Sequence, residues 1–493
     1  MTILLADSGA MPLPVSSPVD ISASGSPPGV PTKEPVATRS ESRRARRKRT
    51  NRRRWWSLAV AVVSVVILAT AGLEAARRID TPLARPVVSS RLPASLVAAG
   101  VAPSVPWPAK GQGAISIPSL GYSQQSGPEW PVPIASLTKL TTAVVVLHDH
   151  PVAANTDGPM ITMTAGDVAE YDNDIHKDES TIPVQVGEQL SERQMLEALL
   201  TRSANNIAYS LAVWDAGSAA AFVGRMNAMA ASLGATSTHY VDVSGFDQQS
   251  VSTAADCLRV TAAGMRDPTF AAIVALPSVT LPLVGTVPNL VPEVGSNSVV
   301  GVKSGYTSHA GGCMVLAGDR VVQGRTVQVL VAVLGLPTPA PVPPTTTTTT
   351  PKVTVPGTPT TTTTTVPPDQ WNVPDPFRFT RPVAESLLGA AEAVVVPVTV
   401  STAGRVVGSV TSTWGRTRHE VPVITRVDAF VLAWPGQQVT SAATLRPVGP
   451  GDVIGSRVGA AVYSLGTQVQ SVPLQLAATV PEPSWWWRLI DAP

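Results

Sequence analysis

Hydrophobic and polar positions divide the chain into segments of different character. The first 42 residues are rich in Ser, Pro, Gly and Val without sustained periodicity, a pattern typical of a disordered tail. Residues 55–73 form an uncharged apolar run, WWSLAVAVVSVVILATAGL. From about 106 to 336 helical and strand-like patterns are mixed, whereas from about 371 to 481 short apolar strands alternate with Gly- or Pro-containing turns. The pattern predicts a domain of mixed helices and strands followed by a small β-domain.

The apolar run predicts a membrane anchor. As a helix, residues 55–73 would span roughly 28 Å, about the thickness of a bilayer's hydrocarbon core. The basic cluster at 43–54 precedes it, and basic flanks stay in the cytoplasm. We therefore expect a single-pass cell-membrane protein with a disordered basic cytoplasmic tail (1–54), a transmembrane signal anchor (55–76) and everything beyond about residue 77 outside the cytoplasm. The alternative is a signal peptide cleaved near Ala69-Thr70-Ala71, with an unusually long basic region before it.

Composition shifts predict the remaining boundaries. A stalk containing Pro and Ala covers 77–105, a domain of mixed pattern 106–336, a Pro/Thr-rich linker 337–370 and a β-rich domain 371–481. The aromatic tail 482–493 carries Trp485-Trp486-Trp487 and is expected either to touch the membrane surface or to pack against protein.

Charge and composition exclude several classes of protein. Residues 1–54 hold 11 basic and 4 acidic side chains, which leaves 25 basic and 30 acidic ones in the rest of the 493-residue chain. The exported part is thus slightly acidic, which argues against nucleic acid as a partner. Two cysteines, Cys257 and Cys313, exclude a disulfide-dense scaffold, and whether they pair stays open. The six histidines form no close helical pair, so we expect no metal and no cofactor.

The first candidate for chemistry is Ser136-x-x-Lys139 at the start of an apolar helical run. Residues three apart share one face of a helix, so the lysine amine can reach the serine hydroxyl. An uncharged amine can accept the hydroxyl proton and make the oxygen a nucleophile. Alone the pattern is weak, because a serine that caps a helix whose lysine reaches solvent looks the same.

Two further elements follow in order. Ser203-Ala204-Asn205 lies between two helical patterns, where both polar side chains can face one cleft or simply cap the next helix. Lys303-Ser304-Gly305 lies on a predicted strand, where the lysine could attract a carboxylate and the glycine admit a substrate backbone, or where the lysine merely protects a sheet edge. The three elements are 67 and then 100 residues apart, and this ordered set is far more specific than its parts.

With these motifs the sequence resembles the low-molecular-weight penicillin-binding proteins of the D-alanyl-D-alanine carboxypeptidase family. Several segments within roughly 106–336 are similar to that family in local sequence and spacing: ASLTKLTTAVVVL, TRSANN, GVKSGYTSHAGGCMVLAG, and STAADCLRV after THYVDVSGFD. A weaker similarity continues through 381–481. The resemblance implies an α/β serine-acyltransferase fold of the β-lactamase/transpeptidase type, with a five-stranded antiparallel sheet flanked by helices, and a C-terminal β-domain.

The resemblance also implies roles. Ser136 would attack the bond between two terminal D-alanines of a peptidoglycan stem peptide, Lys139 would be the general base, and Ser203 would relay the proton to the leaving amine. The substrate-binding residues would be Asn205, Lys303, Ser304, Gly305 and Tyr306. The backbone N–H groups of Ser136 and Tyr306 would form the oxyanion hole. β-Lactam antibiotics would acylate Ser136 as inhibitors.

Two departures from the family pattern stand out. First, Pro337 occupies the position of a family arginine that helps to bind the terminal carboxylate, and Arg378 or Arg381 could substitute for it. Second, the predicted membrane anchor is N-terminal, whereas the family usually has a cleaved signal peptide and a C-terminal amphipathic anchor. The expected function is a serine-type D-alanyl-D-alanine carboxypeptidase. The alternatives are another serine acyl enzyme, either an endopeptidase or a β-lactamase, and a catalytically silent cell-wall binding protein. The acidic stretch Asp172–Glu179 is interpreted as a solvated loop rather than a calcium site.

Overall fold

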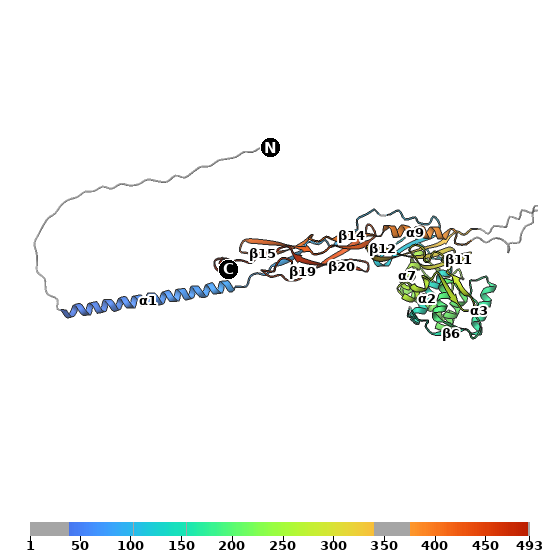
Figure 1. Cartoon of the computed structure of the whole chain (residues 1–493), viewed down its shortest axis with the longest axis horizontal. Helices are drawn as coiled ribbons and strands as arrows, with labels where there is room; N and C mark the ends of the chain where they lie inside the picture. Colours follow the sequence, from blue (N-terminus) through green and yellow to red (C-terminus); the bar gives the residue numbers. More distant parts are fainter. Residues whose placement is uncertain (1–38, 102, 154, 340–374, 492–493) are drawn as a thin grey trace, which may run out of the picture. The chain divides into compact units, whose positions relative to one another are not determined.

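The computed structural model describes residues 39–101, 103–153, 155–339 and 375–491 (Figure 1). The Pro/Thr-rich stretch 340–374 and residues 1–38 lie outside the described part, and with them most of the predicted linker and tail. Contacts divide the chain into two compact units. One contains the N-terminal helix together with the C-terminal Trp485 helix, and the other spans Pro82–Ser484.

The N-terminal unit is built on one long helix, α1 (Arg39–Asp80). Its Arg52–Asp80 part has a mean hydropathy of 2.2 over its most apolar 18 residues, and none of that window is buried. Within the described residues no other single helix passes as a membrane span. The bent pair of helices at 205–216 and 219–232 qualifies only as one joined span, and Ile207 and Phe222 in it are buried in a protein core.

The predicted disordered tail differs from the structure over residues 39–54, which continue α1. Arg, Lys, Ala and Glu are good helix formers, and adding residues to an existing helix avoids the cost of nucleation. The short helix α10 (Trp485–Ile490) packs against the other end of α1, where the Arg488 guanidinium donates to the Ile79 carbonyl oxygen at 3.1 Å. Trp485 and Trp486 remain exposed and stack on each other.

A five-stranded antiparallel sheet organises the domain that contains the three motifs. Its strand order is β11-β12-β13-β3-β4. The bounds are β11 (Val299–Thr307), β12 (Gly311–Val322), β13 (Arg325–Leu336), β3 (Gln112–Ile117) and β4 (Tyr122–Gln125). Because β11 is an edge strand, one side of Lys303-Ser304-Gly305 is left for another partner.

The sheet is covered on both faces, as the apolar side chains on β12 and β13 require. Successive residues alternate between two cores: Cys313 and Val315 face the helical side, whereas Met314 and Leu316 face the opposite side. Figure 1 shows α2, α3 and α7 on one side of this sheet and α9 on the other. The helical side consists of α2 (Thr138–Asp149), α3 (Ala165–His176), α4 (Glu192–Thr201), α5 (Asn205–Ala216), α6 (Ala219–Ser232), α7 (Ala254–Gly264) and α8 (Pro268–Val274).

Short elements complete this domain. They are the 3₁₀ turns η1 (Pro118–Leu120) and η2 (Ala135–Leu137) and the two-residue to four-residue strands β5 (Val132–Pro133), β8 (Val251–Ser252), β6 (Met160–Thr162), β7 (Gln189–Ser191), β9 (Ser278–Leu281) and β10 (Gly285–Pro288). The strand pairs are β5 with β8, β6 with β7 and β9 with β10.

The helix after the Pro/Thr-rich stretch belongs to the motif domain in the structure, not to the β-domain predicted for 371–481. Helix α9 (Thr380–Val394) buries Ala384, Leu387 and Leu388 against the outer face of β12 and β13. That face of the sheet would otherwise expose apolar side chains to water, which costs free energy roughly in proportion to area. The motif domain is therefore completed by a segment beyond the linker.

The C-terminal domain pairs a seven-stranded sheet with a two-stranded one. The sheet order is β1-β15-β16-β20-β19-β18-β2, with β14 paired to β17. The bounds are β1 (Val87–Ser90), β2 (Ser95–Val97), β14 (Val396–Ser401), β15 (Val406–Trp414), β16 (Thr417–Thr425), β17 (Ala429–Ala433), β18 (Gln438–Leu445), β19 (Arg457–Leu465) and β20 (Gln468–Leu476). A separate apolar core lies between β17 and the β19–β20 pair. The predicted fold class, an antiparallel sheet flanked by helices plus a small C-terminal β-domain, is confirmed.

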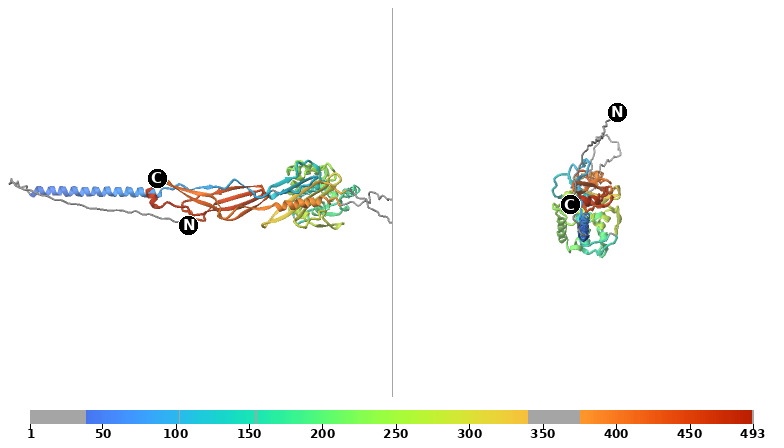
Figure 2. Two further views of the ribbon diagram at one scale, coloured as in Figure 1. Left: turned by 90° about the horizontal axis from the view of Figure 1, so that it is seen from above. Right: turned by 90° about the vertical axis from the view of Figure 1, so that its left-hand side faces the viewer.

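The predicted stalk is part of this β-domain in the structure. Strands β1 and β2 form the two outer edges of the seven-stranded sheet, and Figure 2 shows this blue segment running alongside the red strands. Their partners are β15 and β18, more than 300 residues later in the sequence. Their pairing satisfies backbone groups of β15 and β18 that would otherwise be left unpaired at the edges of the sheet. The stalk interpretation therefore gives way to a role as edge strands.

Glu192 offers a test of this core. It is the first residue of α4, is fully buried, and neither of its carboxylate oxygens has a hydrogen-bond partner among the described residues. Burial, and then the nearby Asp215 carboxylate, raise the pKa of Glu192 from 4.5 to about 7. The folded state therefore keeps this proton between about pH 4.5 and pH 7, where the unfolded chain releases it, so the wild-type protein loses stability as pH rises.

We predict that Glu192→Gln removes this loss. The variant should match the wild type near pH 4.5 and exceed its free energy of unfolding by about 2 kcal/mol at pH 8. Urea unfolding of both proteins across this pH range is the measurement. Equal stability of the two proteins at every pH would contradict the assignment.

Candidate active site

Ser136 and Lys139 meet at the junction of η2 and α2. Ser136 lies in the 3₁₀ turn and Lys139 in the first turn of the helix. The Lys139 Nζ donates to the Ser136 Oγ at 3.0 Å and to the Ser244 carbonyl oxygen at 2.8 Å. Ala135, directly before Ser136, has a φ of 48°, a left-handed conformation that is costly for a residue with a Cβ. Such strain is often found at functional sites.

Lys139 has no exposed surface, which is rare for a lysine. Burial lowers its pKa from 10.5 to about 7, against the opposing effects of Asp242, Glu179 and Asp174, which favour the charged form. A large fraction of the amine is therefore neutral near pH 7 and can accept a proton. The Ser136–Lys139 pair thus consists of a hydroxyl and a base within hydrogen-bond distance.

Ser203 lies in the loop between α4 and α5, as the sequence pattern indicates. Like Ala135, it has a left-handed conformation, with a φ of 62°. Its Oγ is buried and has no hydrogen-bond partner among the described residues. A buried hydroxyl without a partner costs free energy, so this group is available to a substrate or a proton in transit.

Asn205 begins α5 and is held by the segment that precedes it. Its side-chain Nδ2 donates to the Glu179 carboxylate, and its backbone N–H donates to the Ser180 carbonyl oxygen at 2.7 Å. Its Oδ1 has no partner among the described residues. The neighbouring Asn206 fixes the same segment through two hydrogen bonds to the backbone of Ile182.

The acidic stretch Asp172–Glu179 is not the solvated loop that the sequence analysis expects. Helix α3 runs to His176, and Asp174 is only 3% exposed. Burial and the nearby Glu179 carboxylate raise the pKa of Asp174 to about 7. Burial also raises the pKa of Glu179, which the hydrogen bond from Asn205 opposes. Only Asp172 and Asp178 of these acids are exposed.

Strand β11 brings the third motif against the Ser136 turn. A Cβ on Gly305 would lie 3.0 Å from the Ser136 backbone nitrogen, so the glycine permits this close approach. Lys303 is buried, and its Nζ donates to the Ser304 carbonyl oxygen at 2.8 Å. Burial, followed by repulsion from Lys139 and Arg202, holds the pKa of Lys303 well below its usual 10.5. Tyr306 follows on the exposed end of the strand.

These elements surround a cleft of about 690 Å³. Its walls include Ser136, Asn205 and Tyr306, together with residues that the sequence analysis did not single out: Lys177, Asp178, Glu179, Ser180, Gly245, Phe246, Asp247, Gln248, Thr307, Ser308 and His309. Lys139, Ser203 and Lys303 are buried and do not line this cleft. The structure thus brings the predicted site residues from three separate motifs into one region.

The turn at 242–247 is the main feature that sequence reasoning missed. It supplies the Ser244 carbonyl to Lys139, and Gly245 and Phe246 to the cleft wall. The segment THYVDVSGFD was available as a signal, but nothing in its residue types indicates that a backbone carbonyl is the functional group.

The two arginines proposed as substitutes for the family arginine do not line the cleft. Arg381 Nε lies 3.1 Å from Glu293 Oε1, and the same guanidinium also pairs with Asp375 and lies over the Phe377 ring. Arg378 bonds through its backbone to Asp375. Strand β13 ends at Leu336, directly before Pro337.

The two cysteines do not pair, and His148 and His150 do not line the cleft. Cys257 and Cys313 are both buried and free, so the open question of a bridge is answered by two thiols. His148 is exposed at the end of α2, whereas His150 stacks on Trp214 and bonds to Asp215. The described residues hold no group of three metal-ligating side chains.

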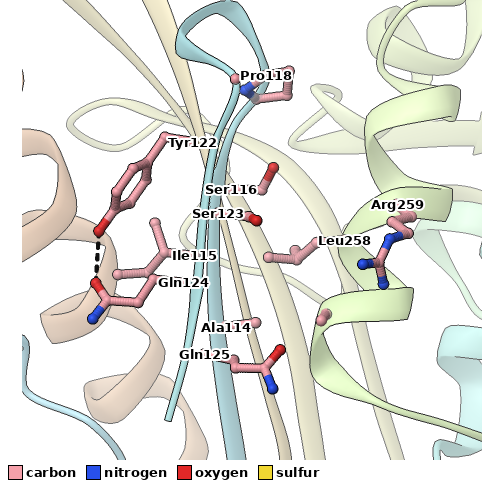
Figure 3. Close-up of a pocket in the computed structure, with 12 residues that line it drawn as sticks. Ala114, Ile115, Ser116, Pro118, Tyr122, Ser123, Gln124, Gln125, Leu258 and Arg259 are labelled. Atoms are coloured by element: carbon pink, nitrogen blue, oxygen red, sulfur yellow. Dashed lines mark hydrogen bonds between the residues drawn. The ribbon is translucent and has the colours of Figure 1, made fainter. Parts of the chain in front are cut away.

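A second hollow, of about 590 Å³, lies between the edge strand β4 and helix α7 (Figure 3). Its ionisable wall residues are Tyr122, whose hydroxyl donates to Gln124 at 2.6 Å, and Arg259, which pairs with Asp256. None of its wall residues belongs to the three motifs, and it contains no lysine or histidine beside its serines. Of these two hollows, therefore, only the first lies beside a serine–base pair such as Ser136 and Lys139.

Comparison with known proteins finds similarity to one family. Residues 124–338 match the family model described as D-alanyl-D-alanine carboxypeptidase. This stretch, somewhat under half of the chain, is similar to that family. The matched range includes all three motifs and the turn at 242–247, but it ends before α9 and the C-terminal β-domain.

The relatives of this part of the chain have two names. A D-alanyl-D-alanine endopeptidase of Pseudomonas aeruginosa is 33% identical over 198 residues, which are 38% of this chain and 60% of the relative. The D-alanyl-D-alanine carboxypeptidase DacB2 of Mycobacterium tuberculosis is 33% identical over 187 residues, 36% of this chain and 59% of the relative. The chain thus spans about 60% of the length of these relatives. The structure of penicillin binding protein 5 from Haemophilus influenzae aligns with 78% of this chain and all of its own, at 20% identity and a TM-score of 0.49.

Gly245 tests how closely the turn must approach the Ser136 segment. Its φ is +80°, and an added Cβ would lie 1.8 Å from the Ala135 carbonyl oxygen. We predict that Gly245→Ala displaces the turn and lowers the rate of acylation by a penicillin at least tenfold.

Gly217 provides the matched control. It also has a positive φ, of 76°, but an added Cβ would meet nothing within 4 Å. Gly217→Ala should cost roughly 1 kcal/mol of stability and leave acylation unchanged. Equal acylation rates in the two variants would show that the close approach at Gly245 is not needed.

Proposed function

We propose that the chain is a serine-type D-alanyl-D-alanine carboxypeptidase that removes the terminal D-alanine from peptidoglycan stem peptides through an acyl-enzyme on Ser136. The main support for this proposal is the buried Lys139 amine. Its pKa is about 7, and it lies 3.0 Å from the Ser136 hydroxyl. The family match and the convergence of the three motifs support the same reaction.

Acylation follows from this pair. The Ser136 Oγ attacks the carbonyl carbon of the penultimate D-alanine while its proton passes to the neutral Lys139 Nζ. The negative charge that develops on the carbonyl oxygen is stabilised by the backbone N–H groups of Ser136 and Tyr306, where each such donor is worth about 3–4 kcal/mol. The C–N bond then breaks, and the proton returns from Lys139 through the Ser203 hydroxyl to the leaving amine.

Deacylation reverses the roles. A water molecule loses a proton to Lys139 as its oxygen attacks the ester carbon, and the Ser136 oxygen regains a proton as the ester bond breaks. The products are the shortened peptide with a free carboxylate and the original enzyme. The same attack on a β-lactam ring would leave a penicilloyl group on Ser136, which makes these antibiotics inhibitors.

The proposed binding residues place the peptide along β11. Asn205 would hold the substrate amide, and Ser304 would donate to the ligand. Gly305 leaves room for the peptide backbone. Lys303 would face the terminal carboxylate, and that negative charge would favour the protonated amine that burial now disfavours. No metal or cofactor takes part in this scheme.

The location of this reaction follows from the N-terminal helix. We propose that Arg52–Asp80 crosses the cell membrane once, with the basic N-terminus in the cytoplasm and the catalytic domain outside it. The peptidoglycan that this domain would act on is found on that side. The exposed Trp485 and Trp486 suit the membrane interface near the exit of the helix.

An endopeptidase is the second candidate. Relatives from Pseudomonas aeruginosa and Escherichia coli carry that name. Pro337 stands where the family arginine would help to bind a terminal carboxylate, and Arg381 is engaged by two carboxylates. Both reactions use the same Ser136 acyl-enzyme and differ in the group that leaves. The substrate therefore distinguishes them.

We predict that the detergent-solubilised full chain releases D-alanine from a stem pentapeptide and that Ser136→Ala lowers this release at least 1,000-fold, since the nucleophile is lost. Lys139→Met, which keeps most of the buried volume, should lower it similarly. Ser232→Ala, on an exposed serine at the end of α6, is the control and should retain full release.

The comparison substrate is a cross-linked peptide dimer. Cleavage of the dimer without release of D-alanine from the pentapeptide would favour the endopeptidase. Release by Ser136→Ala at the wild-type rate would contradict both candidates.

A further inference from the structure

The turn at 242–247 is organised by one carboxylate. Asp242 Oδ2 accepts hydrogen bonds from the Gly245 backbone N–H at 2.8 Å, the Phe246 N–H at 2.9 Å and the Ser244 hydroxyl at 3.0 Å. Its Oδ1 accepts from the Ser250 hydroxyl. A carboxylate with this many donors fixes the path of the backbone between them.

The same turn is attached to helix α2 at successive residues. The Thr142 hydroxyl donates to the Val243 carbonyl oxygen at 2.7 Å, and Lys139 donates to the next carbonyl, that of Ser244, at 2.8 Å. Residues 139 and 142 lie one helical turn apart on one face of α2. The turn therefore runs along the helix, and the carbonyl that binds Lys139 is presented by a backbone that Asp242 holds.

The charges around Lys139 come from three elements. Asp242 on this turn, then Glu179 on the segment after α3 and Asp174 within α3, favour the protonated amine. Lys303 on β11 is close enough for the two lysines to repel each other. Asp242 has the largest effect of these acids and also orients the carbonyl, so one residue influences both the position and the charge of the amine.

We propose that Asp242 is a positioning residue for the Ser136–Lys139 pair: its carboxylate holds the turn that aims the Ser244 carbonyl at the Lys139 amine, and its negative charge sets how much of that amine is protonated. The inference rests on the proposed function, because it assigns how the general base of that reaction is held and tuned. Asp242 itself does not touch the substrate.

The pH dependence of acylation by benzylpenicillin separates the two effects. In the wild-type full chain the rate should rise with pH as Lys139 loses its proton. Asp242→Asn keeps an oxygen that can accept from the turn but removes the charge. We expect the rise of the acylation rate of this variant, the rising limb of its pH profile, to occur at a pH lower by roughly half to one unit. Its maximal rate should stay within about fivefold of that of the wild type.

Asp242→Ala removes the charge and the acceptor together. Its limb should move in the same direction, and its maximal rate should fall at least tenfold because the Ser244 carbonyl is no longer fixed. The difference in maximal rate between the Asn and Ala variants isolates the orienting role.

Asp267→Asn is the matched control. Asp267 also accepts two backbone N–H bonds, from Thr269 at 2.8 Å and Phe270 at 3.0 Å, but it caps α8 rather than the turn at Lys139. If the loss of backbone hydrogen bonds alone changed the pH dependence of acylation, Asp242→Asn and Asp267→Asn would change it equally. The control should therefore keep the wild-type limb even where its thermal stability falls as far as that of Asp242→Asn.

A titration of Lys139 that needs no turnover keeps this inference separate from the proposed reaction. The chain has seven lysines, so the ¹³Cε signal of Lys139 can be assigned by comparison with Lys139→Arg. The midpoint should fall in Asp242→Asn and stay in place in Asp267→Asn. An unchanged midpoint and an unchanged acylation limb in Asp242→Asn would overturn the inference. A lowered midpoint without any acylation in the wild type would instead contradict the proposed function.

Discussion

Removing one lysine amine from water is the constraint on which the site depends. Burying an ammonium group costs free energy, and this cost lowers the pKa of Lys139 from 10.5 to about 7. The amine is not left without partners, since the Ser136 hydroxyl and the Ser244 carbonyl both lie within hydrogen-bond distance. Nearby acids moderate the shift, so the group titrates where a general base is most effective.

The architecture supplies what this burial requires. Strand β11 is an edge strand, and it approaches the Ser136 turn so closely that a Cβ on Gly305 would lie 3.0 Å from the Ser136 backbone nitrogen. Helices cover one face of the sheet and α9 covers the other, so both faces are buried. Within this frame Ala135 and Ser203 adopt left-handed conformations that cost free energy and persist only because the surroundings fix them.

The chemistry was more predictable from the sequence than the boundaries of the domains. Ser136 and Lys139 share a short helical segment, so local spacing already places the amine beside the hydroxyl. The structure also places Ser203 between helices and Lys303 on an edge strand, where the local patterns put them. By contrast, strands β1 and β2 find their partners more than 300 residues away, and no local pattern reports such pairing. Asp174 looks solvated by composition, yet tertiary packing buries it.

The most direct test of the account is the site and pH dependence of the covalent adduct formed with benzylpenicillin. After brief exposure of the full chain, intact mass should increase by one penicilloyl group, and peptide mapping should place it on Ser136. Formation of the adduct should depend on a group that loses its proton near pH 7 and should be lost in Lys139→Met. An adduct on another residue, or one that forms equally fast without the Lys139 amine, would contradict the claim that this buried pair is the reactive centre.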